Sequence, residues 1–441
     1  MSIFENWFGN NKSNNEPNLN FGRYTDSNKS PTQYNHWEQA LISFESEDFI
    51  QSLESFFLYL KDENLENVSW ENTNGVIYFQ FYQGSRRIFG NIKDNYFRAE
   101  AFIAKATSLN VGLLRRLVEK NYKLNYSRFS LDAENNIAIV FTSSLFDASP
   151  YKIYYALKEI ATNADKLDDI LIDEFDSLIP IEEGKKIELS ENIKLCKYQF
   201  IISEIEKTLN EIDSGSLNAE QYPGAISYQL LDLCYKLDYL TVPEGFMMDC
   251  LERIHRIYFT TQEHNIPVID KNNQIISEYK SLLERNSQQY YKEIYDVVST
   301  FGVTSSFGQD QMNTFLDGEL KNLPWYKDNH YNNITIAICG YIVGFLLFNY
   351  AIQKPIKSIF HLYYRILNND YFKKLGYSTD FYDRSKNSFN QKNIKTILEG
   401  IIMQNKTEYK FLTTNFNLVF DSEADFCYSY LMMVRNLDFR K

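Results

Sequence analysis

The spacing of apolar residues between Ser46 and Leu171 alternates between that of helices and that of strands. Ser46 is a capping residue, Glu47 and Asp48 suit a first helical turn, and apolar side chains then recur three and four residues apart, at Phe49, Leu53, Phe56, Phe57 and Leu60. The next segment, VSWENTNGVIYFQFYQGSRRIFGNIKDNYFRAEAFIA, alternates apolar and polar positions between turn-like residues at 71–75, 83–85 and 93–95. This pattern predicts an amphipathic helix followed by a meander of three strands.

A second helix, a hairpin and a third helix follow in the same pattern. Asn110 opens a helix with Val111, Leu114, Leu117 and Val118 on one side. Residues 126–145 then alternate in two runs around a loop at 132–136, which predicts a hairpin. Ser149 caps the last helix with Pro150 at its first position, and a single apolar stripe follows at Ile153, Leu157, Ile160, Ala164, Leu167 and Leu171.

The resulting order of helix, three strands, helix, two strands and helix resembles the fold shared by type III secretion chaperones and the YbjN-like family. The segment LLRRLVEKNYKLNYSRFSLDAENNIAIVFTSSL, residues 113–145, is similar to the family's helix ending in Asn, followed by a strand and a hairpin. The segment SPYKIYYALKEIATNADKLDDIL, residues 149–171, is similar to its closing helix with a late Ala-Asp pair, here Ala164 and Asp165. The resemblance covers residues 40–176. It implies an α+β module, an antiparallel sheet with helices packed on it, that binds proteins without chemistry.

The rest of the chain has helical character. Residues 177–190 are charged and contain a glycine, which predicts a linker. Residues 191–441 then predict an all-helical domain of unknown family, with breaks at SGSLNAEQYPGA, Pro243, IPVIDKN and FGVTSSFGQ. The expected helices are 191–213, 225–240, 244–263, 272–299, 332–352, 355–370 and 391–403.

The segment ITIAICGYIVGFLLFNYAI, residues 334–352, has no charged residue and is long enough to cross a hydrocarbon core. Polar and small residues dilute it, and the basic residues cluster on its C-terminal side. Such a span would therefore export more than the first 300 residues without a signal peptide. We expect a central buried helix in which Gly340 and Gly344 let a neighbouring helix approach closely.

Charge and cysteine content limit the partners and the compartment. The chain of 441 residues has a net charge of −13, which repels nucleic acid and anionic membranes. The five cysteines are widely spaced, odd in number and free of CxxC pairs, as expected for buried thiols in a reducing compartment. The N-terminus lacks a basic segment followed by an apolar run. We expect a cytoplasmic protein.

The first 36 residues are rich in Asn, Ser and other polar types and predict a disordered tail, residues 1–36. Within it Ile3, Phe4, Trp7 and Phe8 have the spacing of a short helix with one apolar stripe. Trp7 and Phe8 are therefore candidate partner-binding residues, although a loose end with a few apolar residues would look the same.

No pattern for nucleotide binding, zinc proteolysis, serine hydrolysis or calcium binding occurs in the sequence. His255 and His264, the closest pair of the five histidines, are nine residues apart and would lie near opposite faces of a helix. We therefore expect no catalytic residue, no cofactor and no metal site.

The strand VIYFQFYQ is the most informative candidate site. If Ile77, Phe79 and Phe81 face the helices, the opposite face carries the partner-binding candidates Val76, Tyr78, Gln80 and Tyr82, with Arg86 and Arg87 on the adjoining turn. Aromatic residues there indicate a covered face, and the cover is either the helical domain, another protein or a second copy of the chain.

The sequence thus predicts a non-enzymatic adaptor or chaperone-like protein that holds an extended or helical segment against its sheet or the sheet edges. Two alternatives remain at this level. One is an enzyme of an unrecognised family with its site in the helical half, which would require acidic and basic side chains to converge in one cleft. The other is a membrane-attached component anchored through 334–352.

Overall fold

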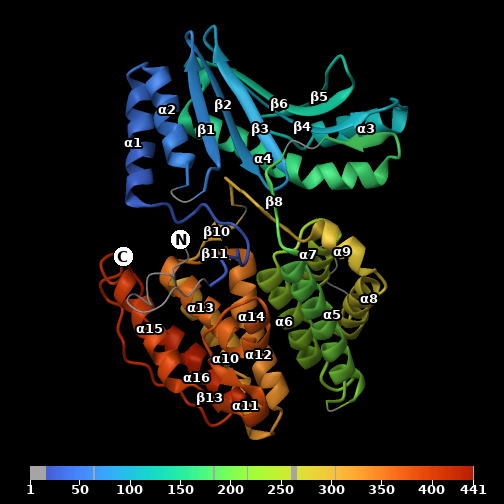
Figure 1. Cartoon of the computed structure of the whole chain (residues 1–441), viewed down its shortest axis with the longest axis vertical. Coiled ribbons are helices and arrows are strands. Elements are labelled where there is room, and N and C mark those ends of the chain that lie inside the picture. The colour runs from blue at the N-terminus through green and yellow to red at the C-terminus, as the bar shows by residue number, and fades with distance from the viewer. Residues whose placement is uncertain are drawn as a thin grey trace. The chain divides into compact units, whose positions relative to one another are not determined.

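The computed structural model describes residues 16–62, 65–181, 184–215, 217–259, 266–302 and 304–440. The chain divides into two compact units. An α+β unit consists of Tyr24–Glu188 and Asp296–Val303, and a helical unit consists of Met1–Arg23, Leu189–Tyr295 and Thr304–Lys441. Each unit therefore contains a short segment that is remote in sequence from its main body (Figure 1).

The α+β unit contains one antiparallel sheet with the strand order β1-β2-β3-β4-β6-β5, and β7 pairs with β4 beyond this path. The strands are β1 (Val68–Thr73), β2 (Val76–Gln83), β3 (Arg86–Lys93), β4 (Tyr96–Ala106), β5 (Arg128–Leu131), β6 (Asn136–Ser144) and β7 (Leu178–Pro180). The helices are α1 (Pro31–Glu45), α2 (Phe49–Leu60), α3 (Val111–Asn121) and α4 (Pro150–Glu174). An antiparallel sheet with helices is thus present, as predicted.

Tight turns and one glycine fix the register of the first four strands. Asn74 and Gly75 have φ values of +54° and +81°, and Asp94 and Asn95 have +51° and +61°, the left-handed pairs that two-residue hairpins require. Gly90 lies opposite Phe79, and a Cβ at Gly90 would approach the Phe79 ring to 2.6 Å and the Arg98 carbonyl oxygen to 2.0 Å. The turns set the pairing, and Gly90 makes room for an aromatic ring in the core.

The element order differs from the predicted one in two places. Four strands rather than three precede α3, because Val68–Thr73 forms a strand of its own before the Asn74-Gly75 turn. An additional helix, α1, precedes α2. Its sequence, PTQYNHWEQALISFE, has few apolar residues, and Ser30 and Gln33 form a capping box at its start. The helix was missed because its polar composition hides its buried residues Gln33, Ala40 and Ser43.

The helical unit is built around α12 (Asn332–Asn349), which packs against α6 (Pro223–Thr241) and α16 (Glu423–Asn436). The other helices are α5 (Glu191–Asp213), α7 (Gly245–Phe259), α8 (Val268–Leu283), α9 (Ser287–Glu293), α10 (Gln309–Leu320), α11 (Leu323–Asp328), α13 (Lys354–Leu367), α14 (Asn369–Lys374) and α15 (Gln391–Asn405). Short two-stranded pairs in this unit join β10 (Ser305–Ser306) to β11 (Tyr350–Ala351) and β12 (Tyr382–Asp383) to β13 (Ser388–Phe389). A third pair, β8 (Lys186–Glu188) with β9 (Tyr295–Val297), belongs to the α+β unit except for Tyr295.

Helix α12 is long and apolar enough to cross a membrane, and most of it is buried inside the protein, as in the core helix of a soluble protein. A Cβ at Gly340 would approach Asp232 Oδ1 to 2.1 Å, and one at Gly344 would approach the Cβ of Tyr235 to 2.5 Å. Both glycines therefore allow α6 to pack closely, as predicted from their spacing.

Several other boundaries in this half differ from the predicted ones. The expected helix 272–299 is divided into α8, α9 and β9, because Asn286 forms a capping box with Gln289 and starts a new helix. Helices α10, α11 and α16 were not predicted at all. Their apolar residues are spaced too irregularly to mark a helix before the neighbouring elements are known.

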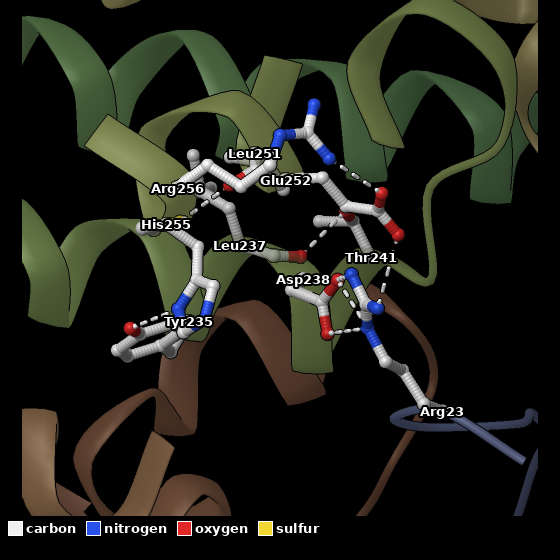
Figure 2. A network of polar contacts seen from close by, with 10 residues as sticks. Arg23, Tyr235, Leu237, Asp238, Thr241, Leu251, Glu252, His255 and Arg256 are labelled. Atoms are coloured by element: carbon white, nitrogen blue, oxygen red, sulfur yellow. Dashed lines mark hydrogen bonds and ion pairs between the residues drawn. The ribbon is translucent and has the colours of Figure 1, made fainter. Parts of the chain in front are cut away.

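Residues 1–36 were predicted to form a disordered tail, but residues 16–23 lie in the helical unit, where Figure 2 shows Arg23, and residues 24–36 lie in the α+β unit, where Pro31 begins α1. Phe21 packs against His361 and Phe372, with ring centroids 4.9 and 5.2 Å away. Gly22 donates its N–H to the Tyr239 carbonyl at 2.8 Å. The aromatic and charged residues of this short arm, and not its average composition, decide its structure.

Candidate functional site

Strand β2 has one buried and one more exposed face, as the alternation of its residues predicts. Ile77, Phe79 and Phe81 are buried in the core of the α+β unit. On the other face Val76, Gln80 and Tyr82 are half-buried, and Tyr78 is 48% exposed. The helices of this unit pack on the Phe79 side, since α2 and α4 share its core.

The face that carries Tyr78 continues across the sheet. The strand register places Tyr82 beside Arg87, Gln80 beside Phe89 and Phe89 beside Glu100. The same register adds Asn91, Arg98, Phe102, Val140 and Arg128 to this surface. We call this set of residues on β2 to β6, together with Tyr78, the open face. Among the described residues of the α+β unit, no helix belongs to this side.

Aromatic and charged groups organise the open face. The rings of Phe89 and Phe102 lie 5.6 Å apart, and the guanidinium of Arg87 lies 5.0 Å from the centre of Phe89. Arg98 donates to Glu100 at 2.6 Å. The result is a surface on which the half-buried rings of Phe89 and Phe102 lie among arginines, a composition typical of contact surfaces.

Arg86 does not belong with these residues. It is buried and donates from Nη1 to the carbonyl of Ile181 at 2.7 Å, so it holds the segment after α4. Neighbouring residues of a strand point to opposite faces, and the sequence prediction had placed Arg86 and Arg87 together by treating them as part of a turn. Trp7 and Phe8 lie outside the residues that the structure describes.

A second candidate site, which the sequence did not reveal, is a polar cleft along α5. It consists of two adjoining pockets of about 340 and 270 Å³ that share Glu204, Leu367, Asn368 and Arg384. The larger pocket also contacts Gln229, Asp232 and Lys236 of α6, and Ala337 and Gly340 of α12. We call the larger pocket the α5 cleft.

The most buried charged groups in the α5 cleft compensate one another, and Lys207 and Glu211 also line the cleft. Lys236 Nζ lies 2.9 Å from Glu204 and 3.5 Å from Asp232. Arg384 pairs with Glu423 at 2.9 Å. Burial raises the pKa of Asp232 to about 6 against the opposing effect of Lys236. Burial also acts to raise the pKa of Glu204, but Lys236 and Lys207 lower it below its usual value. Two carboxyl groups with oppositely shifted pKa values thus share one ammonium group.

Two uncharged side chains of the α5 cleft have unused hydrogen-bonding groups. Gln229 and Thr208 are 8% and 9% exposed and line the cleft. Within the described part of the chain, neither side chain has a hydrogen-bond partner. Neither polar group is among the fully buried atoms without a partner, so both reach the open space of the cleft, where water or a ligand can bond to them.

The sequence contains a weak signal for the cleft, because polar residues recur at helical spacing in both α5 and α6. Gln229, Asp232 and Lys236 stand at i, i+3 and i+7 in the otherwise apolar helix α6, and Glu204, Thr208 and Glu211 stand at i, i+4 and i+7 in α5. Each polar stripe alone also describes a solvated helix face. Only the packing of α5 on α6 makes the two stripes face one cavity.

The histidines that the structure describes do not form a site. His255 Nδ1 lies 2.9 Å from the Tyr235 hydroxyl and His361 Nδ1 lies 3.0 Å from that of Tyr239. His264 lies outside the described residues. Among the residues described, no group of His, Cys, Asp and Glu side chains has the geometry of a metal site. All five cysteines are buried and free.

Comparison of the chain with models of protein families and with curated proteins finds no match. The resemblance of residues 40–176 to the secretion-chaperone and YbjN-like fold therefore stays a prediction.

Proposed function

We propose that this protein is a non-enzymatic binding protein, an adaptor or chaperone-like molecule, that holds another protein on the open face of its α+β unit. The observation that carries the proposal is the asymmetry of the sheet. One face is closed by helices, while the other presents Tyr78 about half exposed beside a row of apolar rings and arginines. Rings with polar tips and arginines are the side chains that contribute most to protein interfaces.

The charges of the open face favour an acidic partner. Arg87, Arg98 and Arg128 stand on it against Glu100, on a chain whose net charge is −13. Carboxylate groups of a partner would meet arginines here, while the remaining surface of the chain repels acidic molecules. The same overall charge disfavours nucleic acid as the occupant.

Docking on the face is favoured over pairing with the sheet edges. The edge strand β1 is polar along its outer part, with Glu71, Asn72 and Thr73 all exposed. Charged and polar residues on an edge discourage the addition of another strand. The aromatic centre of the open face, formed by Phe89 and Phe102, offers apolar area that the edge lacks.

Site-specific photo-crosslinking in cells tests this function. A benzoyl-phenylalanine at Tyr78 should form a covalent adduct with one discrete protein, because this half-exposed side chain lies on the proposed contact surface. The matched control is Tyr122 at the end of α3, which is 92% exposed and remote from the open face. Nuclease treatment of the adduct separates a protein partner from nucleic acid. Equal labelling at the two positions, or none at Tyr78, would contradict the proposal.

The cytoplasm is the compartment that this proposal assumes. The five free, buried cysteines and the burial of α12 support it. Fractionation of cell extracts, with a carbonate wash of the membranes, tests it: the protein should remain in the soluble fraction.

A further inference from the structure

We propose that the α5 cleft binds a small, uncharged molecule rich in hydroxyl groups, of about the size of one sugar ring, and that Gln229 and Thr208 hydrogen-bond to it directly. This site lies in the helical unit and is independent of the open face. It extends the role of the chain from protein contact to small-molecule recognition.

The size of the cleft sets the first limit. Its volume of about 340 Å³ lies at the lower end of the range for small-molecule sites, roughly 300–1,000 Å³. Ala337 on α12 contributes to this space because its side chain is small. A peptide or a dinucleotide is too large for it.

The charges of the cleft set the second limit. Lys236 is compensated by Glu204 and Asp232, and Arg384 by Glu423. A charged ligand beside Lys236 would have to break its pairs with Glu204 and Asp232, which leaves a largely buried charge without its partner at a large cost. An uncharged ligand leaves both pairs intact.

The hydrogen-bonding groups of Gln229 and Thr208 set the third limit on the ligand. The Gln229 amide both donates and accepts hydrogen bonds, and so does the Thr208 hydroxyl. The two side chains belong to different helices, α6 and α5, and line the same cleft. Hydroxyl groups complement both, because each hydroxyl also donates and accepts.

Ligand-observed saturation-transfer NMR with the full-length protein tests the site. The probes are glucose, ribose and myo-inositol as neutral polyols, with glucosamine, glucose 6-phosphate and adenosine as matched cationic, anionic and aromatic compounds. At least one neutral polyol should receive saturation, and it should bind more tightly than its charged counterpart.

Two nearly isosteric variants connect binding to the assigned residues. Thr208→Val and Gln229→Met each remove a polar group that has no partner in the protein, so both proteins should fold with nearly unchanged unfolding temperatures. Each should weaken the polyol about tenfold through the lost hydrogen bond. Thr335→Val is the control, because Thr335 is also buried in the helical unit but donates to the Tyr331 carbonyl outside the cleft. Its polyol affinity should equal that of the wild type.

Three results would overturn the assignment. The first is the absence of saturation transfer to every neutral polyol, which would leave the cleft to water. The second is tighter binding of a charged or aromatic probe. The third is polyol binding that survives both Thr208→Val and Gln229→Met. None of these results depends on crosslinking at Tyr78, so failure here is distinguishable from failure of the proposed function.

Discussion

Arg23 and Asp238 form a buried, two-pronged ion pair in the helical unit, with Arg23 Nε and Nη2 donating to the carboxylate at 2.9 to 3.2 Å (Figure 2). Asp238 is 5% exposed, and the guanidinium lies 3.8 Å from the centre of the Phe348 ring. Burial opposes the charge of Arg23, but Asp238 and Glu252 raise its pKa above the usual value. The arm at residues 16–23 is therefore part of the fold of this unit.

Replacing Arg23 by Met should lower the free energy of unfolding by about 3 kcal/mol, because it leaves the Asp238 carboxylate buried without its main cation. Urea denaturation followed by circular dichroism measures the change. Arg435→Met is the matched control, since Arg435 makes the same two-pronged contact with Asp317 at an exposed position. The control should cost less than 1 kcal/mol. Equal losses would show that the arm contributes nothing beyond a surface ion pair.

The pH dependence of stability should reflect His361. Burial lowers the pKa of His361 to about 3, with further lowering by Arg365 and Lys357. The unfolded chain therefore binds a proton near pH 6.5 that the folded chain does not, so stability falls as the pH falls from about 6.5 toward 3. Between pH 6.5 and 5 the loss should amount to about 2 kcal/mol.

Denaturation of His361→Gln at several pH values checks this expectation. Glutamine keeps a group that can bond to the Tyr239 hydroxyl but does not titrate, so the variant should lose less stability below pH 6.5 than the wild type. His330→Asn, at an exposed position with φ of +63°, should retain the wild-type pH dependence. An unchanged slope for His361→Gln would contradict the assignment.

The close approach of α12 to α6 predicts a strong effect at Gly340. In Gly340→Ala the added methyl group would lie 2.1 Å from Asp232 Oδ1, so the helices must separate or the Asp232–Lys236 pair must shift. We expect a loss of about 2 kcal/mol in thermal or urea unfolding. Gly318→Ala in α10 has open space around the new methyl group and should stabilise the protein by about 0.5 kcal/mol. Stability changes of opposite sign in the two variants would show that the loss at Gly340 comes from packing, because both substitutions raise helix propensity.

The segment Asp296–Val303 should be essential to the α+β unit. Phe301 is buried in its core, and its N–H and carbonyl both bond to the side chain of Gln83. Phe301→Ala should cost about 3–4 kcal/mol through lost apolar burial and a cavity. Phe411→Ala, at an exposed position of the helical unit, should change the stability by less than 1 kcal/mol. A small effect at Phe301 would mean that this segment only rests on the unit.

The local sequence determined the features that depend on the period of a single element. Alternation along β2 assigned Ile77, Phe79 and Phe81 to the core and Tyr78 to the other face, because successive strand residues point to opposite sides. The spacing of Gly340 and Gly344 likewise indicated a close helix contact in a buried α12. These features require no knowledge of what lies across from them.

Tertiary structure alone decided the features that join remote segments. The arm around Arg23 and the segment around Phe301 gain their stability from Asp238 and Gln83, each more than 200 residues away in the chain. The α5 cleft exists because polar stripes on α5 and α6 meet beside small residues of α12. A polar side chain looks the same in sequence whether it faces water or a cavity, and only the packing of its helix against a partner distinguishes the two.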